Sequence, residues 1–118
     1  MVTYVLPSLM ITIWEYLDPK GRSLFAKWFA SLNAPAAAKV ATALVRIEQG
    51  NFSNSKGVGA GVYEYRIDFG PGYRIYFGKD GETVVILLGG GTKKYQTVDI
   101  LAAQNCWHEF KARKPEET

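Results

Sequence analysis

The stretch from Val62 to Leu88 reads VYEYRIDFGPGYRIYFGKDGETVVILL and contains three consecutive apolar runs. In residues 62–69 and 73–78, apolar and polar side chains alternate with a period of two, as they do in half-buried strands. Residues 83–88 are nearly continuously apolar. Short turn sequences separate the runs, namely Gly70-Pro71-Gly72 and Asp80-Gly81. The stretch therefore predicts three antiparallel strands joined by tight hairpins.

On either side of this stretch, the pattern predicts one further strand and three helices. Residues 10–16 are rich in β-formers and end at a turn, which indicates a strand. Apolar residues then recur every three to four positions from Ser23 to Leu32, and again between Asn33 and Gly50, as on one face of a helix. A last helix is expected around residues 100–110. The order β-α-α-β-β-β-α predicts an α+β fold, an antiparallel sheet with helices packed on one face.

The length of 118 residues corresponds to one domain. We expect a single domain over residues 10–113 and a charged tail over 114–118. Residues 1–9 are interpreted as an N-terminal extension, and the sequence leaves open whether the chain starts at Met1 or Met10. Apolar residues make up 47% and aromatic residues 14%, which excludes an intrinsically disordered chain.

Charge and cysteine content narrow the class of partner. The net charge is +3 and the isoelectric point about 9.0, a mild basic bias compatible with a nucleic-acid partner. Cys106 is the only cysteine, so no internal disulfide can form, and a cytosolic location fits best. One cysteine and one histidine cannot make a Cys/His zinc site, and we expect no metal and no cofactor. No apolar run approaches the roughly 20 residues that a bilayer requires, so no membrane partner is expected.

The turn lengths predict how the strands pair. A three-residue loop at 70–72 places Asp68 opposite Arg74 and Arg66 opposite Tyr76. The Asp80-Gly81 hairpin then brings Arg74 opposite Leu87, with Val85 on the same side. We therefore expect one face of the sheet to carry Arg66, Arg74 and Tyr76 beside Val85 and Leu87, and the opposite face to form the core.

This face has two interpretations. The first is structural: Asp68 and Arg74 form a cross-strand ion pair, and Arg66 lies over the Tyr76 ring. The second is functional: two guanidinium groups beside an aromatic ring bind an RNA backbone and a stacked base.

Several short motifs, in this order and spacing, resemble the RelE/ParE toxin superfamily, and within it the HigB-like addiction module killer proteins. They are KGVG at 56–59, YRI at 65–67, GPGYRIYF at 70–77 and LLGGGTKK at 87–94. The likeness covers most of residues 10–113. It implies a RelE-like fold with the element order predicted above.

The resemblance also implies a function and partners. Members of this superfamily act as toxins of type II toxin–antitoxin systems, and RelE-like members cut mRNA on the ribosome and so inhibit translation in the cytoplasm. The partner is a protein antitoxin, often with a helix-turn-helix domain. Two other functions stay open: a ParE-like inhibitor of gyrase, and a non-toxic binding module on the same fold.

Individual residue roles follow from the same resemblance. Metal-independent cleavage needs a base for the 2′-hydroxyl, cations for the phosphate and an acid for the leaving oxygen. Arg74 matches the arginine of the Gly-Tyr-Arg motif and is expected to stabilise the transition state. Arg66 and Lys93 supply further positive charge, and Glu64, where RelE itself has a lysine, is a candidate general base. The residues expected to bind RNA are Lys94, Tyr76, Lys56 and Gln96.

Overall fold

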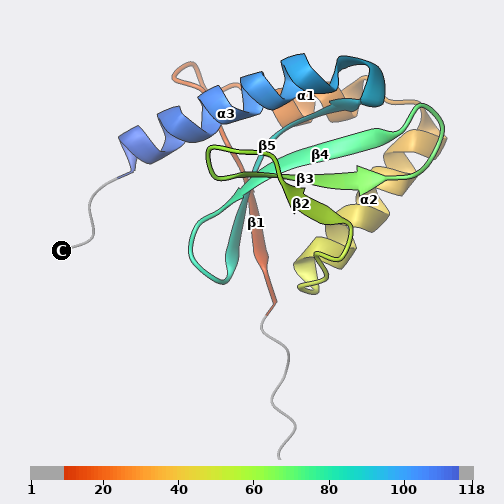
Figure 1. Cartoon of the computed structure of the whole chain (residues 1–118), viewed down its shortest axis with the longest axis horizontal. Helices are drawn as coiled ribbons and strands as arrows, with labels where there is room; N and C mark the ends of the chain where they lie inside the picture. The colour runs from red at the N-terminus through yellow and green to blue at the C-terminus, as the bar shows by residue number, and fades with distance from the viewer. Residues whose placement is uncertain (1–9, 115–118) are drawn as a thin grey trace, which may run out of the picture.

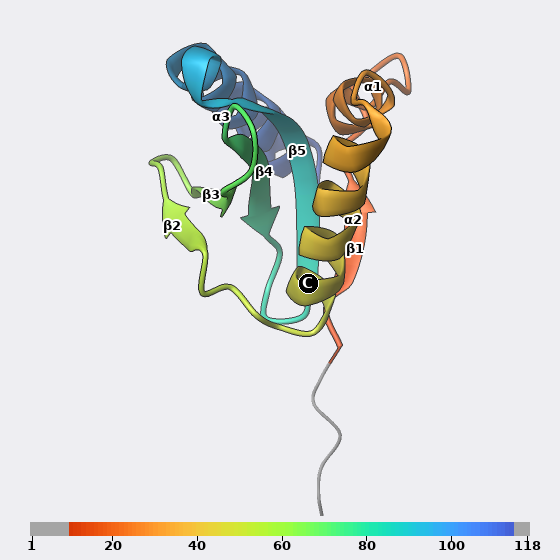
Figure 2. The same ribbon diagram turned by 90° about the vertical axis from the view of Figure 1, so that its right-hand side faces the viewer.

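A computed structural model describes residues 10–114 as a five-stranded sheet with helices on both faces (Figures 1 and 2). The expected N-terminal extension, residues 1–9, and residues 115–118 of the expected tail lie outside the residues that the structure describes. The α+β class is confirmed. The elements are β1 (Thr12–Glu15), α1 (Leu24–Ala30), α2 (Ala34–Glu48), β2 (Ser55–Gly57), β3 (Val62–Ile67), β4 (Tyr73–Lys79), β5 (Val84–Thr92), a 3-10 turn (Lys93–Tyr95) and α3 (Gln96–Arg113).

The strand order across the sheet is β1-β5-β4-β3-β2. Strands β3, β4 and β5 are antiparallel, as expected, and β2 also pairs antiparallel with β3. Strand β1 pairs parallel to β5 at the edge of the sheet, which departs from the expected antiparallel sheet. Strand β2 was not predicted from the sequence, because its Ser-Lys-Gly sequence has no apolar alternation.

The helix starts follow from the sequence. The Ser23 side chain accepts a hydrogen bond from the Ala26 amide, and Asn33 accepts one from the Ala36 amide. Both residues are good N-caps because their side-chain oxygens satisfy an amide that lacks a partner within the helix. The short link between α1 and α2 follows from these caps.

The hairpin between β3 and β4 differs from the predicted one. Ile67 pairs with Tyr73 and Arg66 with Arg74, so the connection spans residues 68–72 rather than 70–72. The expected pairs Asp68–Arg74 and Arg66–Tyr76 are therefore wrong. Because the shift is two residues, each side chain keeps its predicted face of these two strands.

The pairing of β4 with β5 differs more. Strand β5 continues through the glycines at 89–91, where the sequence predicts its end, and an irregularity in the register lies beside Tyr76 and Phe77. Tyr76 consequently pairs with Gly89 and Arg74 with Gly91. Val85 and Leu87 pack with α2, on the face opposite Arg74, so their predicted placement beside the arginines is wrong.

Two apolar clusters lie on opposite faces of the sheet, and each is covered by helices. One combines Ile75 and Phe77 with side chains of α1 and α2. The other combines Tyr76 with Ala103 and Trp107 of α3. Figure 2 shows α3 and the α1–α2 pair on either side of the strands. The sequence predicted helices on one face of the sheet only. Helices α1 and α2 do share one face, whereas α3 covers the opposite face.

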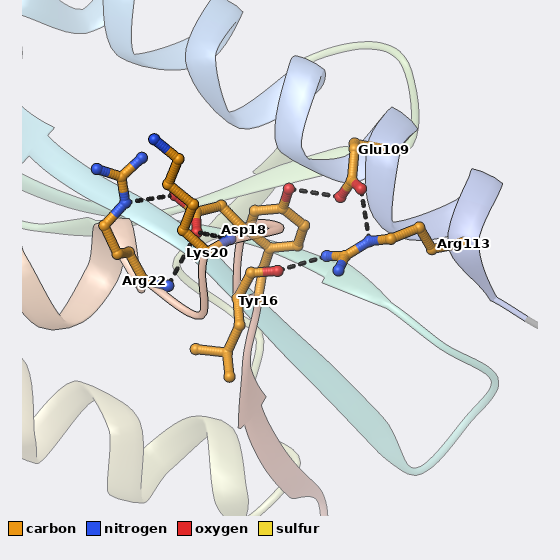
Figure 3. Close-up of polar contacts among 7 residues, drawn as sticks. Tyr16, Asp18, Lys20, Arg22, Glu109 and Arg113 are labelled. Carbon is orange, nitrogen blue, oxygen red and sulfur yellow. Dashed lines mark hydrogen bonds and ion pairs between the residues drawn. The ribbon is translucent and has the colours of Figure 1, made fainter.

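Polar side chains in the C-terminal half of α3 contact the residues that follow β1 (Figure 3). The Tyr16 hydroxyl donates to Glu109 at 2.5 Å, and Glu109 pairs with Arg113 at 2.5 Å. Arg113 also donates to the Leu17 carbonyl. Within residues 10–114, no helix is long and apolar enough to cross a membrane.

Candidate active site

Glu64 and Arg74 form a buried charged pair on the face of the sheet that α3 covers. Their exposed fractions are 1% and 5%. Arg74 Nε lies 3.5 Å from Glu64 Oε1, and Arg74 Nη1 donates to the Gly72 carbonyl at 2.7 Å. Gln96, the first residue of α3, donates from Nε2 to Glu64 Oε2 at 2.7 Å. Arg74 Nε has no hydrogen-bond partner among residues 10–114, so the guanidinium is oriented by the Nη1 hydrogen bond to Gly72 and by the charge of Glu64.

The turn before β4 is shaped to hold Arg74. Gly72 has a φ of +79°, which L side chains rarely adopt, and a Cβ there would lie 3.0 Å from Arg74 Nη1. Its carbonyl accepts from Arg74 and also from the Lys93 amide at 2.9 Å. The Gly72 carbonyl therefore joins the β4 arginine to the turn that carries the predicted lysine.

Exposed cations surround the buried pair. Arg66 is exposed and lies directly opposite Arg74 on β3, and Lys56 is exposed and lies opposite Glu64 on β2. Lys93 and Lys94 are exposed in the 3-10 turn, where Lys94 Nζ lies 5.5 Å from the centre of the Tyr95 ring. Like charges placed opposite each other are unfavourable, and the Glu64 carboxylate offsets part of this cost at Arg74.

Tyr76 lies under α3 rather than on an open surface, which corrects the expectation of an exposed aromatic ring. It is fully buried, and its hydroxyl has no hydrogen-bond partner among the described residues. Burial, the largest cause, and the nearby carboxylates of Glu64 and Asp99 raise the pKa of Tyr76. Burial also raises the pKa of Asp99. Asp99 is thus a neighbour of the site to which the sequence assigned no role.

The structure brings together Glu64, Arg74 and Gln96 by direct contact, with Tyr76 beside Glu64 in the strand register. It places Arg66, Lys56 and Lys93 at the rim, whereas Lys94 contacts Tyr95. Gly72 was missed as a site residue, although it directly precedes the Tyr-Arg pair of the motif. Among residues 10–114, no group of three or more His, Cys, Asp and Glu side chains could hold a metal ion. The cluster can bind and polarise a phosphate through its cations.

Comparison with known proteins supplies two likenesses. No family model matches the sequence. An uncharacterized protein of Haemophilus influenzae is 42% identical over 81 residues, which cover 68% of this chain and 82% of the relative. A mutant of the E. coli toxin RelE, solved in the free state, superposes with a TM-score of 0.59 at 16% identity, over 81% of this chain and 97% of the RelE chain. The latter likeness shows the fold.

Proposed function

Because this chain belongs to the same family as the H. influenzae protein and has the fold of RelE, we propose that it is the toxin of a type II toxin–antitoxin system. We further propose that it belongs to the HigB-like group and cuts mRNA on the ribosome without a metal ion. The observation that carries this proposal is Arg74, oriented by Glu64 and the Gly72 carbonyl beneath a rim of exposed cations.

The proposed reaction is attack of a ribose 2′-oxygen on the adjacent phosphorus. The O2′–P bond forms, the P–O5′ bond breaks, a base takes the proton of the 2′-hydroxyl, and an acid protonates the leaving O5′. The phosphorane gains negative charge, which Arg74 stabilises through preorganised hydrogen bonds. Arg66, Lys93 and Lys94 bind the flanking phosphates, because RNA affinity comes largely from neutralising phosphate charge.

Glu64 stays the candidate general base. Each of its carboxylate oxygens faces a neighbour, Arg74 for one and Gln96 for the other, so these contacts also support a positioning role toward Arg74. Lys56 and Gln96 are proposed to contact RNA at the margin of the site. Tyr76 would reach a base only if α3 moved, because the helix covers its ring.

The partners follow from the proposed reaction. The substrate is mRNA on the ribosome, which places the protein in the cytoplasm. The inhibitor is a protein antitoxin, which we propose to be of the helix-turn-helix type.

The decisive experiment compares the wild type with Arg74→Lys. Lysine keeps the positive charge beside buried Glu64, so the fold is expected to survive, but it lacks the forked donors of arginine. After induction in a bacterium, we expect growth arrest and codon-phased mRNA 5′ ends with the wild type. We expect about 100-fold fewer cuts with Arg74→Lys, the usual cost of losing one such donor. Thermal unfolding of both proteins provides the control for folding.

The other outcomes identify the rival functions. Growth arrest with intact mRNA and a DNA-damage response would replace the ribonuclease by a gyrase inhibitor. No arrest, from a start at either Met1 or Met10, would leave a non-toxic binding module on the RelE fold.

A further inference from the structure

A polar groove lies where α2 approaches the edge of β3, and it shares Arg66 and Lys56 with the cationic rim of the Glu64–Arg74 pair. One part has a volume of about 260 Å³ and is lined by Lys39 and Arg46 of α2 and by Arg66 of β3. A neighbouring part, of about 300 Å³, adds Lys56 of β2. Arg66 and Asn54 line both parts, so the two parts adjoin. We name this feature the basic groove.

The local sequence builds the basic groove from two elements. Lys39 and Arg46 are separated by two helical turns, so they lie on one face of α2 together with Thr42, which also lines the groove. Strand β2 pairs with β3 only along residues 63–65. The edge of β3 beyond that pairing is therefore open toward α2, apart from the hydrogen bond from the Arg66 amide to the Asn54 carbonyl at 3.0 Å.

No ion pair within residues 10–114 neutralises the cations of the basic groove. Four cationic side chains line it, against one acidic side chain, that of Asp68. Within the described part of the chain, none of the four forms an ion pair. Lys39 Nζ instead lies 5.2 Å from the centre of the Phe69 ring. An anionic ligand is the natural complement of such a surface.

We propose that the basic groove binds the backbone of single-stranded RNA outside the bond that is cut. This proposal rests on the proposed function, since Arg66 belongs both to the groove and to the cationic rim beside Arg74. A strand bound at Arg74 would therefore continue across Arg66 toward α2. Asn54 and Ser55 also line the groove, and the Ser55 hydroxyl is buried without a hydrogen-bond partner among residues 10–114. Donors of these types suit phosphate and sugar oxygens, whereas the Thr42 hydroxyl already donates to the Ala38 carbonyl at 3.0 Å.

The test measures binding of a labelled single-stranded RNA of about 20 nucleotides at several salt concentrations. The variant is Lys39→Gln/Arg46→Gln, and the matched control is Lys20→Gln/Lys111→Gln, which removes the same charge at exposed positions outside the groove. Losing two phosphate contacts should lower the salt slope by about 1.4 and weaken binding about tenfold near 0.1 M salt. The control should bind like the wild type.

Each alternative outcome decides a different claim. If both double variants bind RNA equally well, the proposal that the groove binds RNA is contradicted. The proposed cleavage, which the Arg74 variant tests separately, is unaffected by that result. If RNA binding depends on the groove but ribosome-bound mRNA is not cut, the proposed RNA-binding role of the groove is supported and the proposed ribonuclease function is contradicted. If a poly-glutamate peptide binds the wild type more tightly than RNA does, and the Lys39→Gln/Arg46→Gln variant no longer binds the peptide, the ligand of the groove is an acidic protein segment instead of RNA. No RNA binding by the wild type would overturn both proposals.

Discussion

Tyr16 shows how one side chain joins segments that are distant in sequence. It follows β1, and its hydroxyl donates to Glu109 near the end of α3 (Figure 3). Burial of the ring, and then the hydrogen bond and charge of Glu109, raise the pKa of Tyr16 to about 12 from its ordinary value of 10.0. A phenol with a raised pKa is stabilised in its protonated form by the folded state.

Removing this hydroxyl should change the response of stability to alkaline pH. Because the pKa of Tyr16 is higher in the folded protein, the contribution of the protonated phenol is fully present below pH 10 and is lost as pH rises toward 12. We expect the free energy of unfolding of Tyr16→Phe to fall less steeply in this window than that of the wild type. Urea unfolding at several pH values between 10 and 12 measures how the free energy of unfolding changes with pH. Tyr95→Phe, at an exposed position, should follow the wild type, and parallel curves for all three proteins would contradict the prediction.

Strand β5 shows how glycines let an element fit between two helical layers. A Cβ on Gly90 would come within 2.2 Å of the Trp28 ring of α1, and one on Gly78 of β4 within 2.4 Å of the Trp107 ring of α3. At Gly89, by contrast, nothing lies within 4 Å of that position. The strands therefore approach the tryptophans closely only where the residue has no side chain.

Two matched substitutions test this close approach. Gly78→Ala should destabilise the fold by about 1–3 kcal/mol, because the buried Trp107 ring must shift. Gly89→Ala, also in a strand, should cost far less or stabilise slightly, because alanine reduces the freedom of the unfolded chain. Chemical denaturation of the two variants gives the comparison. Equal losses would mean that strand conformation, rather than the tryptophan contact, requires these glycines.

The molecule as a whole consists of a sheet between two unequal helical layers (Figure 2). Trp107 is buried and anchors α3, whereas Trp14, on the edge strand β1, is 61% exposed. The two tryptophans thus belong to different environments of the same sheet. Stability of the α3 layer should depend on the buried ring and not on the exposed one.

Substitution of each tryptophan measures that difference. Trp107→Ala should lower the free energy of unfolding by about 3–5 kcal/mol, since it removes a large buried ring. Trp14→Ala should change it by no more than about 0.5 kcal/mol, as at other exposed positions. Thermal and urea unfolding of both variants report the result. A large loss at Trp14 would show that the β1 edge is covered in solution, for instance by another molecule.

The candidate site was only partly predictable from the sequence. The motif around Gly72 and Arg74 located the arginine, and the alternation of β3 placed Glu64 on the same face. The sequence nevertheless predicted Asp68 as the partner of Arg74, because the expected strand register rested on turn length alone. The connection over residues 68–72 instead pairs Arg74 with Arg66 and brings Glu64 into contact. Such a choice depends on packing beyond the hairpin.

Residue patterns alone were sufficient for the α+β class and the order of the seven main elements, because periodicity and turn chemistry act locally. Three-dimensional packing was needed for the rest. The continuation of β5 through Gly90 and Gly91 brings the strand close to the Trp28 ring of α1 and to the Asp99 side chain of α3. The position of α3 over Tyr76 and Glu64, and the meeting of α2 with Arg66 in the basic groove, join segments far apart in the chain. No local pattern encodes such contacts, because they arise from burial and charge across the whole fold.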